Sequence, residues 1–249
     1  MLDGDSSAEY LDLCPSMREK EVPPMKKTRE STRMVFAVAL LLMPLVAVQG
    51  ADAPKPRIVV VFGDSITAGG ALPGKDRDKL WLRVIVRDVH GALSLVNEGK
   101  GGRPTASRSE FDAMLTRQPH VDVLVIALGM NDSRDITRPC VPKAMANVRY
   151  MIERARQTYG AALPILLVGP SNINKDALGP TKPIANQREA KLREIGDALA
   201  KLAKQTNCDF VSLFGVVPEA SLGKDGVHPD AAGNAAIAAV MRRKLMMLR

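Results

Sequence analysis

Five short runs rich in valine, isoleucine and leucine alternate with segments of helical periodicity, and this alternation restricts the fold more than any other feature of the chain. Within each run the apolar residues do not alternate with polar ones, which is typical of strands buried on both faces of a sheet. Apolar stripes at helical spacing between the runs indicate helices that cover those faces. The pattern predicts an α/β fold of three layers, α/β/α, with a five-stranded parallel sheet. The predicted strands are residues 58–62, 93–97, 121–128, 164–168 and 209–214.

Two polar motifs follow the first and the last of these runs. Gly63-Asp64-Ser65 comes directly after the first, and Asp225-Gly226-Val227-His228 comes after the fifth. A serine hydroxyl is a poor nucleophile until a base takes its proton, and the base needs a partner that orients it. Because ligands of such sheets bind outside the carboxyl ends of the strands, Ser65, Asp225 and His228 are expected to meet there. The motifs predict a serine hydrolase.

Only one of the three histidines can reach Ser65 in this topology. His90 precedes the second predicted strand and His120 precedes the third, so both are expected at the opposite edge of the sheet. His228 is therefore the predicted base. Two further polar groups fall at the carboxyl edge, namely residues 97–102 after the second strand and residues 129–132 after the third.

These motifs, in this order, resemble those of the GDSL or SGNH hydrolases over residues 57–248. Gly63-Asp64-Ser65 is similar to the first block of that family, Asn97 with Gly102 to the second, Gly129-Met130-Asn131-Asp132 to the third, and Asp225-Gly226-Val227-His228-Pro229 to the fifth. The resemblance implies a flavodoxin-like fold and ester hydrolysis without a metal or an organic cofactor. It implies Ser65 as nucleophile, His228 as base and Asp225 as the residue that orients the base.

The resemblance also implies an oxyanion hole made of the Ser65 N–H, the Gly102 N–H and the Asn131 side chain. Gly102 is preferred to the glycines before it because it lies five residues after Asn97, as in the family pattern. Donors of this kind stabilise the charge that develops on the ester carbonyl oxygen, each by ~10²–10³ in rate. The alternative for Asn131 and Asp132 is a strand-end turn, a common use of Asn and Asp.

The first 50 residues are predicted to lie outside the hydrolase domain, which is expected to span residues 51–249. A basic segment before the apolar run Met34–Val48 indicates a signal peptide at residues 25–50, so the mature protein is predicted to be secreted or periplasmic. At fifteen residues, with Pro44 inside, the run is short for a membrane span, and no stable membrane insertion is expected after cleavage. An uncleaved anchor is the alternative. Residues 1–24 are interpreted as a non-native or disordered extension.

The charge distribution and the cysteines restrict which binding partners and metals can be expected. Residues 51–249 hold 29 Lys and Arg against 20 Asp and Glu, but the positive charges are scattered rather than interleaved with aromatics, so no nucleic-acid partner is predicted. Cys140 and Cys208 lack metal-ligand spacing and are expected to be free thiols, with a disulfide as the alternative. No metal motif is present in the sequence, and the oligomeric state stays open.

The predicted function is hydrolysis of short-chain acyl esters of small molecules or carbohydrates. The connection from residue 170 to residue 183 is polar and lacks an apolar stripe that could form a lid, and a buried CH₂ contributes ~0.8 kcal/mol only where an apolar wall receives it. Arg103 or Arg134 is expected to face the alcohol part of the ester. Three alternatives stay open: a non-catalytic binder of envelope glycans on the same fold, a lysophospholipase or thioesterase for longer acyl chains, and a nucleotide binder, which would leave His228 unexplained.

Overall fold

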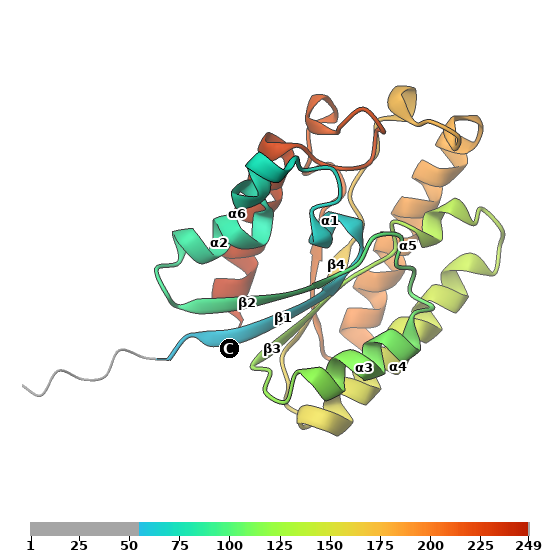
Figure 1. The fold of residues 1–249 in the computed structure, drawn as a ribbon. Helices are drawn as coiled ribbons and strands as arrows, with labels where there is room; N and C mark the ends of the chain where they lie inside the picture. The colour runs from blue at the N-terminus through green and yellow to red at the C-terminus, as the bar shows by residue number, and fades with distance from the viewer. Residues whose placement is uncertain (1–54, 249) are drawn as a thin grey trace, which may run out of the picture. The chain divides into compact units, whose positions relative to one another are not determined.

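The chain folds around an all-parallel sheet whose five strands have the order β2-β1-β3-β4-β5 (Figure 1). The computed structural model describes residues 55–248. Each strand begins within two residues of its predicted start, and the predicted fold class is confirmed. The strands are β1 (Arg57–Gly63), β2 (Leu93–Gly99), β3 (Val123–Ala127), β4 (Ile165–Gly169) and β5 (Asp209–Ser212).

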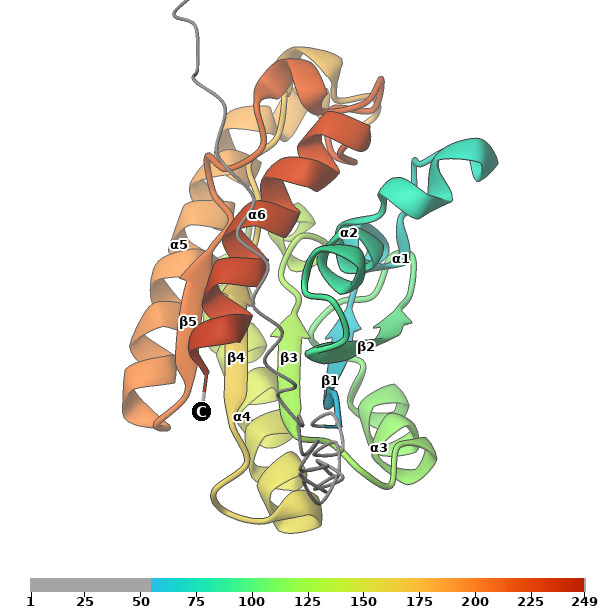
Figure 2. The same cartoon turned by 90° about the vertical axis from the view of Figure 1, so that its left-hand side faces the viewer.

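Helices cover both faces of the sheet, and each face has its own apolar core. The longer helices are α2 (Trp81–Asp88), α3 (Arg108–Arg117), α4 (Cys140–Tyr159), α5 (Ala185–Gln205) and α6 (Ala231–Met247). In Figure 2, α2 and α6 lie in front of the sheet and α4 lies behind it. Alternate residues of one strand serve different cores: Val59 and Val61 pack on the side of α2 and α6, whereas Val60 and Phe62 pack on the side of α3 and α4. This division explains why the strands are apolar throughout.

The strands end earlier than two of the apolar runs that predicted them. The third run extends to Leu128 but β3 ends at Ala127, and the fifth run extends to Phe214 but β5 ends at Ser212. Leu128 and Leu213 are nevertheless buried, because the chain continues into the core after the ladder stops. An apolar run therefore marks the buried segment, and only part of that segment pairs as a strand.

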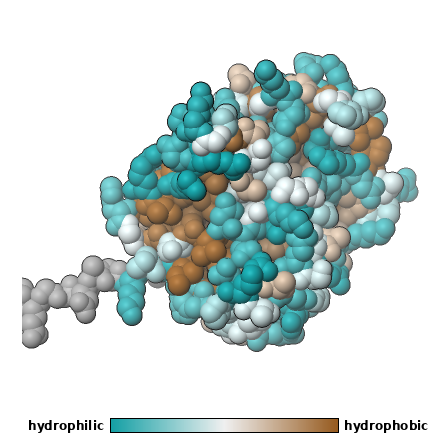
Figure 3. All heavy atoms as spheres, viewed as in Figure 1, coloured by the Kyte–Doolittle hydropathy of each residue, from teal (hydrophilic) through white to brown (hydrophobic). Residues whose placement is uncertain are grey.

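An apolar groove lies on the surface at α2 and β2. Figure 3 shows a brown area on the side of α2 and β2. Leu82, Val86 and Leu95 line a groove of about 670 Å³ there, together with Arg83 and Arg87.

The proposed extension at residues 1–24 and the signal peptide at residues 25–50 lie outside the described residues. Within residues 55–248, none of the helices combines the length and the apolar composition needed to cross a bilayer. Cys140 and Cys208 are free thiols, as expected.

Candidate active site

A tight turn after β1 places Ser65 at the carboxyl edge of the sheet, as the first residue of the short helix α1 (Ser65–Ala68). Asp64 caps this helix, since its Oδ1 accepts a hydrogen bond of 3.0 Å from the Ile66 N–H. Gly63 is required here because a Cβ at this position would lie 2.1 Å from Thr67 Oγ1. Burial of Asp64 raises the pKa of its carboxyl group to about 6, although the bond from Ile66 acts in the opposite direction.

The loop between β5 and α6 holds Asp225 and His228 in a closed turn. The Gly223 N–H donates to the His228 carbonyl oxygen at 2.7 Å, and the Gly226 N–H donates to the Gly223 carbonyl oxygen at 2.8 Å. Gly226 has a positive φ of 69°, and a Cβ there would lie 2.4 Å from the Asn174 carbonyl oxygen. The Asn174 N–H in turn donates to the Gly226 carbonyl oxygen at 2.8 Å, so the loop after β4 braces this turn.

Ser65, His228 and Asp225 form one continuous hydrogen-bonded chain. His228 Nε2 lies 2.7 Å from Ser65 Oγ, and His228 Nδ1 lies 2.5 Å from Asp225 Oδ2. Asp225 Oδ1 accepts bonds of 3.0 Å from the N–H groups of Val227 and His228. Burial acts to raise the pKa of Asp225, but the hydrogen bonds from His228 and Val227 outweigh it and hold the pKa below its usual value. Asp225 therefore stays ionised beside the imidazole.

His90 and His120 lie at the opposite edge of the sheet from Ser65, as the topology predicts. His90 lies three residues before the start of β2, and His120 lies three residues before the start of β3. His120 Nε2 pairs with Asp122 at 3.2 Å at that edge. His228 is thus the histidine that contacts Ser65.

The predicted oxyanion donors belong to loops that hydrogen bonds of Arg103 join to one another and to Gly63 of the turn before Ser65. The N–H groups of Ser65 and Gly102 have no hydrogen-bond acceptor among residues 55–248. Gly102 has a positive φ of 73°, and nothing lies within 4 Å of the position that a Cβ would take. Asn131 Nδ2 donates to the Arg103 carbonyl oxygen at 3.1 Å, which holds this amide against the loop of Gly102 and leaves its second N–H for another acceptor.

Asn97 and Asp132 hold the loops of the site in place. Asn97 Nδ2 donates to the Thr67 carbonyl oxygen at 3.0 Å, and Asn97 Oδ1 accepts from the Gly99 N–H at 2.8 Å. Asp132 accepts from the Thr105 N–H and, at 2.6 Å, from Thr105 Oγ1. Asp132 therefore joins the loop after β3 to the loop after β2, and its side chain does not cap the segment that follows it.

The expectation that Arg103 faces the alcohol part of a substrate is wrong. Its side chain is only 6% exposed, and its Nε pairs with Glu110 Oε2 at 3.0 Å. Arg103 Nη1 donates to the carbonyl oxygens of Gly63, at 2.7 Å, and Glu98. The guanidinium group also lies 4.0 Å from the centre of the Phe62 ring. These partners draw the side chain under the loop, where it supports the strand ends.

Two open cavities flank His228. One, of about 530 Å³, is lined by polar residues that include Arg134, Arg188 and Lys224. The other, of about 540 Å³, lies toward Leu72 and Pro73. In the loop after β4, Ile173 and Leu178 are buried in the core, so these apolar side chains do not cover either cavity.

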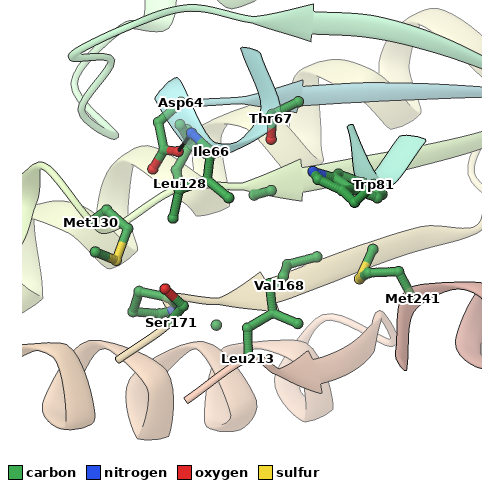
Figure 4. A pocket seen from close by; sticks show the side chains of 13 residues that line it. Asp64, Ile66, Thr67, Trp81, Leu128, Met130, Val168, Ser171, Leu213 and Met241 are labelled. Carbon is green, nitrogen blue, oxygen red and sulfur yellow. Dashed lines mark hydrogen bonds between the residues drawn. The ribbon is translucent and has the colours of Figure 1, made fainter. Parts of the chain in front are cut away.

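A third cavity, which is lined by Asp64, Ile66 and Thr67 but not by Ser65, lies in the interior and is much smaller. Its volume is about 30 Å³, and Figure 4 shows Asp64, Trp81, Met130 and Met241 around it. Trp81 and Met130 are almost fully buried. A space of this size holds about two water molecules, not an acyl chain.

Sequence reasoning missed Gly70. A Cβ on this residue would lie 3.2 Å from His228 Nε2 and 3.2 Å from Ser65 Cβ, and its N–H donates to the Ser65 carbonyl oxygen at 2.8 Å. The pair Gly69-Gly70, which follows α1 directly, is the sequence feature that could have indicated this close approach. Within residues 55–248, no group of three or more His, Cys, Asp or Glu side chains could hold a metal ion.

Comparison with known proteins identifies the family to which the chain is related. The model of the GDSL-like lipase/acylhydrolase family matches residues 61–236, a range that includes Ser65, Asp225 and His228. A GDSL lipase of Mycobacterium tuberculosis is 29% identical over 186 residues, which cover 71% of this chain and 76% of that protein.

Two solved structures share the fold. An aryl esterase of Mycobacterium smegmatis superposes with a TM-score of 0.66 at 21% identity, covering 78% of this chain and 100% of that one. A carbohydrate acetylesterase family member from Sinorhizobium meliloti gives 0.65 at 19% identity, covering 77% and 98%.

Proposed function

Since the chain belongs to the GDSL-like lipase/acylhydrolase family and is a carboxylic ester hydrolase, we propose that it is an exported serine esterase for short-chain acyl esters. The observation that carries this proposal is the hydrogen-bonded chain from Ser65 Oγ through His228 to Asp225. The three groups stand in the order that nucleophilic catalysis needs, because each one activates or orients the group before it.

In the proposed mechanism, Ser65 Oγ attacks the ester carbonyl carbon while His228 Nε2 accepts the hydroxyl proton. The carbonyl oxygen becomes negative and accepts hydrogen bonds from the Ser65 and Gly102 N–H groups and from Asn131. Asp225, ionised, stabilises the imidazolium and fixes its tautomer. His228 then returns the proton to the leaving alcohol oxygen, and an acyl group remains on Ser65. Water attacks this acyl group with the same base and releases the carboxylic acid.

The short acyl length is supported by the loop after β4. Its apolar side chains Ile173 and Leu178 are committed to the core, so they do not form an apolar lid over Ser65. The solved structures of similar fold include an aryl esterase and a carbohydrate acetylesterase family member, which is consistent with a small acyl group on an aryl or sugar alcohol. The alternative of longer acyl chains, as a lysophospholipase or thioesterase would take, requires the apolar groove of Leu82, Val86 and Leu95 to receive them.

Chemical labelling and a substrate series test the proposal together. A fluorophosphonate probe is expected to label the wild type at Ser65, and Ser65→Ala is expected to abolish both labelling and hydrolysis. Among acetyl, butyryl, octanoyl and palmitoyl esters of one phenol, kcat/KM is expected to be highest for acetyl or butyryl. A rise toward palmitoyl contradicts the short-chain assignment. A folded wild type that neither labels nor hydrolyses any ester supports the glycan-binding alternative.

Export is supported by the basic segment before the apolar run Met34–Val48 and by the small residue Gly50 before Ala51. The mature protein is expected to begin at or near Ala51 and to be recovered from the medium or the periplasm. N-terminal sequencing of the recovered protein measures this directly, and an intact chain that begins at Met25 in the cytosol contradicts it.

A further inference from the structure

A buried arginine opens into the 530 Å³ cavity beside His228. Arg188, in the first turn of α5, is 1% exposed and lines this cavity together with Asp225 and His228. Its Nε donates to Ser133 Oγ at 3.1 Å, and its Nη1 donates to Thr181 Oγ1 at 3.1 Å. Both partners are neutral hydroxyl groups.

Arg188 has no ion-pair partner among the described residues; Asp225 attracts it only at longer range and is itself bound to His228. Among residues 55–248, no carboxylate forms an ion pair with Arg188, and no acceptor binds its Nη2. A guanidinium group has five N–H donors and stays charged at every physiological pH. Charged side chains are almost never fully buried unless they are paired, because an unpaired buried charge is costly. The missing partner is therefore expected to come from a ligand.

Two further residues that line the cavity are also positively charged. Arg134 and Lys224 stand exposed at its rim, and neither forms an ion pair among the described residues. The carboxylate that the cavity does contain, Asp225, is bound to His228. Three cations therefore face a space of about 530 Å³, which is within the usual range of small-molecule sites.

The position of the cavity indicates which part of an ester enters it. His228 lines the cavity, whereas Gly102 and Asn131 do not. In the proposed mechanism the carbonyl oxygen lies at Gly102 and Asn131, and the leaving alcohol oxygen lies at His228. A group attached to the leaving oxygen can therefore extend toward Arg188.

We infer that this esterase prefers esters whose alcohol part carries an anionic oxygen group, such as a carboxylate, and that Arg188 binds this group. The inference rests on the proposed esterase function and adds the class of alcohol. A guanidinium fork matches the two oxygens of a carboxylate, and such charge-assisted bonds are stronger than neutral ones. Arg134 and Lys224 add long-range attraction to the same group.

The test compares two matched substrates, the acetyl ester of 3-hydroxybenzoate and the acetyl ester of 3-hydroxybenzamide. The first carries a carboxylate where the second carries a neutral amide of similar size. In the wild type, the ratio of kcat/KM for the anionic ester to that for the neutral ester is expected to exceed the same ratio in Arg188→Met by about tenfold or more. Arg188→Lys, which keeps the charge but not the fork, is expected to fall between the two.

Lys201→Met is the matched control. Lys201 is exposed on the same helix and outside the cavity, so its loss removes one positive charge without touching the site. The ratio is expected to be unchanged. If Arg188→Met does not fold, product inhibition of the wild type decides the matter: 3-hydroxybenzoate is expected to inhibit hydrolysis of the neutral ester more strongly than 3-hydroxybenzamide.

Two outcomes overturn the inference and can be told apart. If Arg188→Met slows both esters equally, Arg188 acts only through Ser133 on the turn that carries Asn131, and the anion subsite is wrong while the esterase function stands. If the folded wild type hydrolyses neither ester and is not labelled by a fluorophosphonate, the proposed function itself fails.

Discussion

The two buried arginines at the carboxyl edge of the sheet have opposite surroundings. Arg103 is 6% exposed, pairs with Glu110, donates to two backbone carbonyl oxygens and stacks on Phe62. Arg188 is 1% exposed and, among residues 55–248, its hydrogen-bond partners are two hydroxyl groups. The protein therefore satisfies the first guanidinium itself and leaves the second partly unsatisfied. A buried cation of the first kind supports a loop, whereas one of the second kind points to a ligand.

The largest effect on activity is expected from a substitution of Asn131, whose amide is bound to the Arg103 backbone and not to Arg188. Asn131→Ala removes one donor to the developing oxyanion and is expected to lower kcat by ~10²–10³. Because this donor acts on the carbonyl oxygen, anionic and neutral esters should lose the same factor, unlike in Arg188→Met. Steady-state kinetics on the two acetyl esters measure it. A loss confined to the anionic ester would place Asn131 in the alcohol site instead.

A second effect concerns Asp64, a buried carboxyl group that also lacks a full ion pair among the described residues. Its pKa in the folded protein is raised to about 6 from 3.8. The native state therefore binds the proton more tightly than the unfolded state, and the free energy of unfolding falls as the pH rises from about 4 to about 6. The shift corresponds to a loss of up to ~3 kcal/mol above that window.

Asp64→Asn keeps an oxygen that can cap α1 and removes the titration. The stability of this variant relative to the wild type is expected to increase from pH 4 to pH 7.5. Urea unfolding at the two pH values measures the free energy of unfolding of the variant and of the wild type. Carboxyl groups with lowered pKa values, such as Glu110, contribute equally to both proteins and cancel in the difference between them. A difference that does not change with pH would mean that the pKa of Asp64 is not raised in the folded protein.

The third prediction compares the contributions of Arg103 and Arg188 to the free energy of unfolding. Arg103→Met removes the side-chain bonds to the carbonyl oxygens of Gly63 and Glu98 and the ion pair with Glu110, and we expect a loss of about 2 kcal/mol in the free energy of unfolding. Arg188→Met removes two bonds to hydroxyl groups but also an unpaired buried charge, so its loss should be smaller. Urea unfolding of both variants under one condition gives the order. Equal losses would remove the distinction between the two sites.

The positions of the strands along the chain could be predicted from the sequence better than the contacts of single side chains. Five apolar runs and the rule that sites lie at carboxyl strand ends were enough to bring Ser65, Asp225 and His228 together. Those contacts follow from topology, because each residue stands directly at a strand end or in the loop that follows one. The family motifs likewise pointed to Asn131 and Gly102.

The direction of Arg103 could not be predicted in this way. Its guanidinium is held by the Gly63 carbonyl oxygen, 40 residues earlier in the chain, and by a ring on the neighbouring strand. The brace between Gly226 and Asn174 depends on a similar contact between distant loops. Neither contact leaves a periodic signal in the sequence, and Arg188 looks like any other polar residue of an amphipathic helix.

The smallest expected effect is at Gly70, where a single methyl group tests how closely the Ser65 and His228 side chains must fit. A Cβ at Gly70 would lie 3.2 Å from both His228 Nε2 and Ser65 Cβ, so the two side chains must move by a few tenths of an ångström. A shift of about 1 Å in a reacting group can lower the rate by about 10²-fold, and we expect Gly70→Ala to lower kcat by about tenfold on either ester. Gly74→Ala is the control, because nothing lies within 4 Å of a Cβ there. Equal rates for the two variants would show that the site tolerates this displacement, and the 2.7 Å contact between His228 and Ser65 would then not limit turnover.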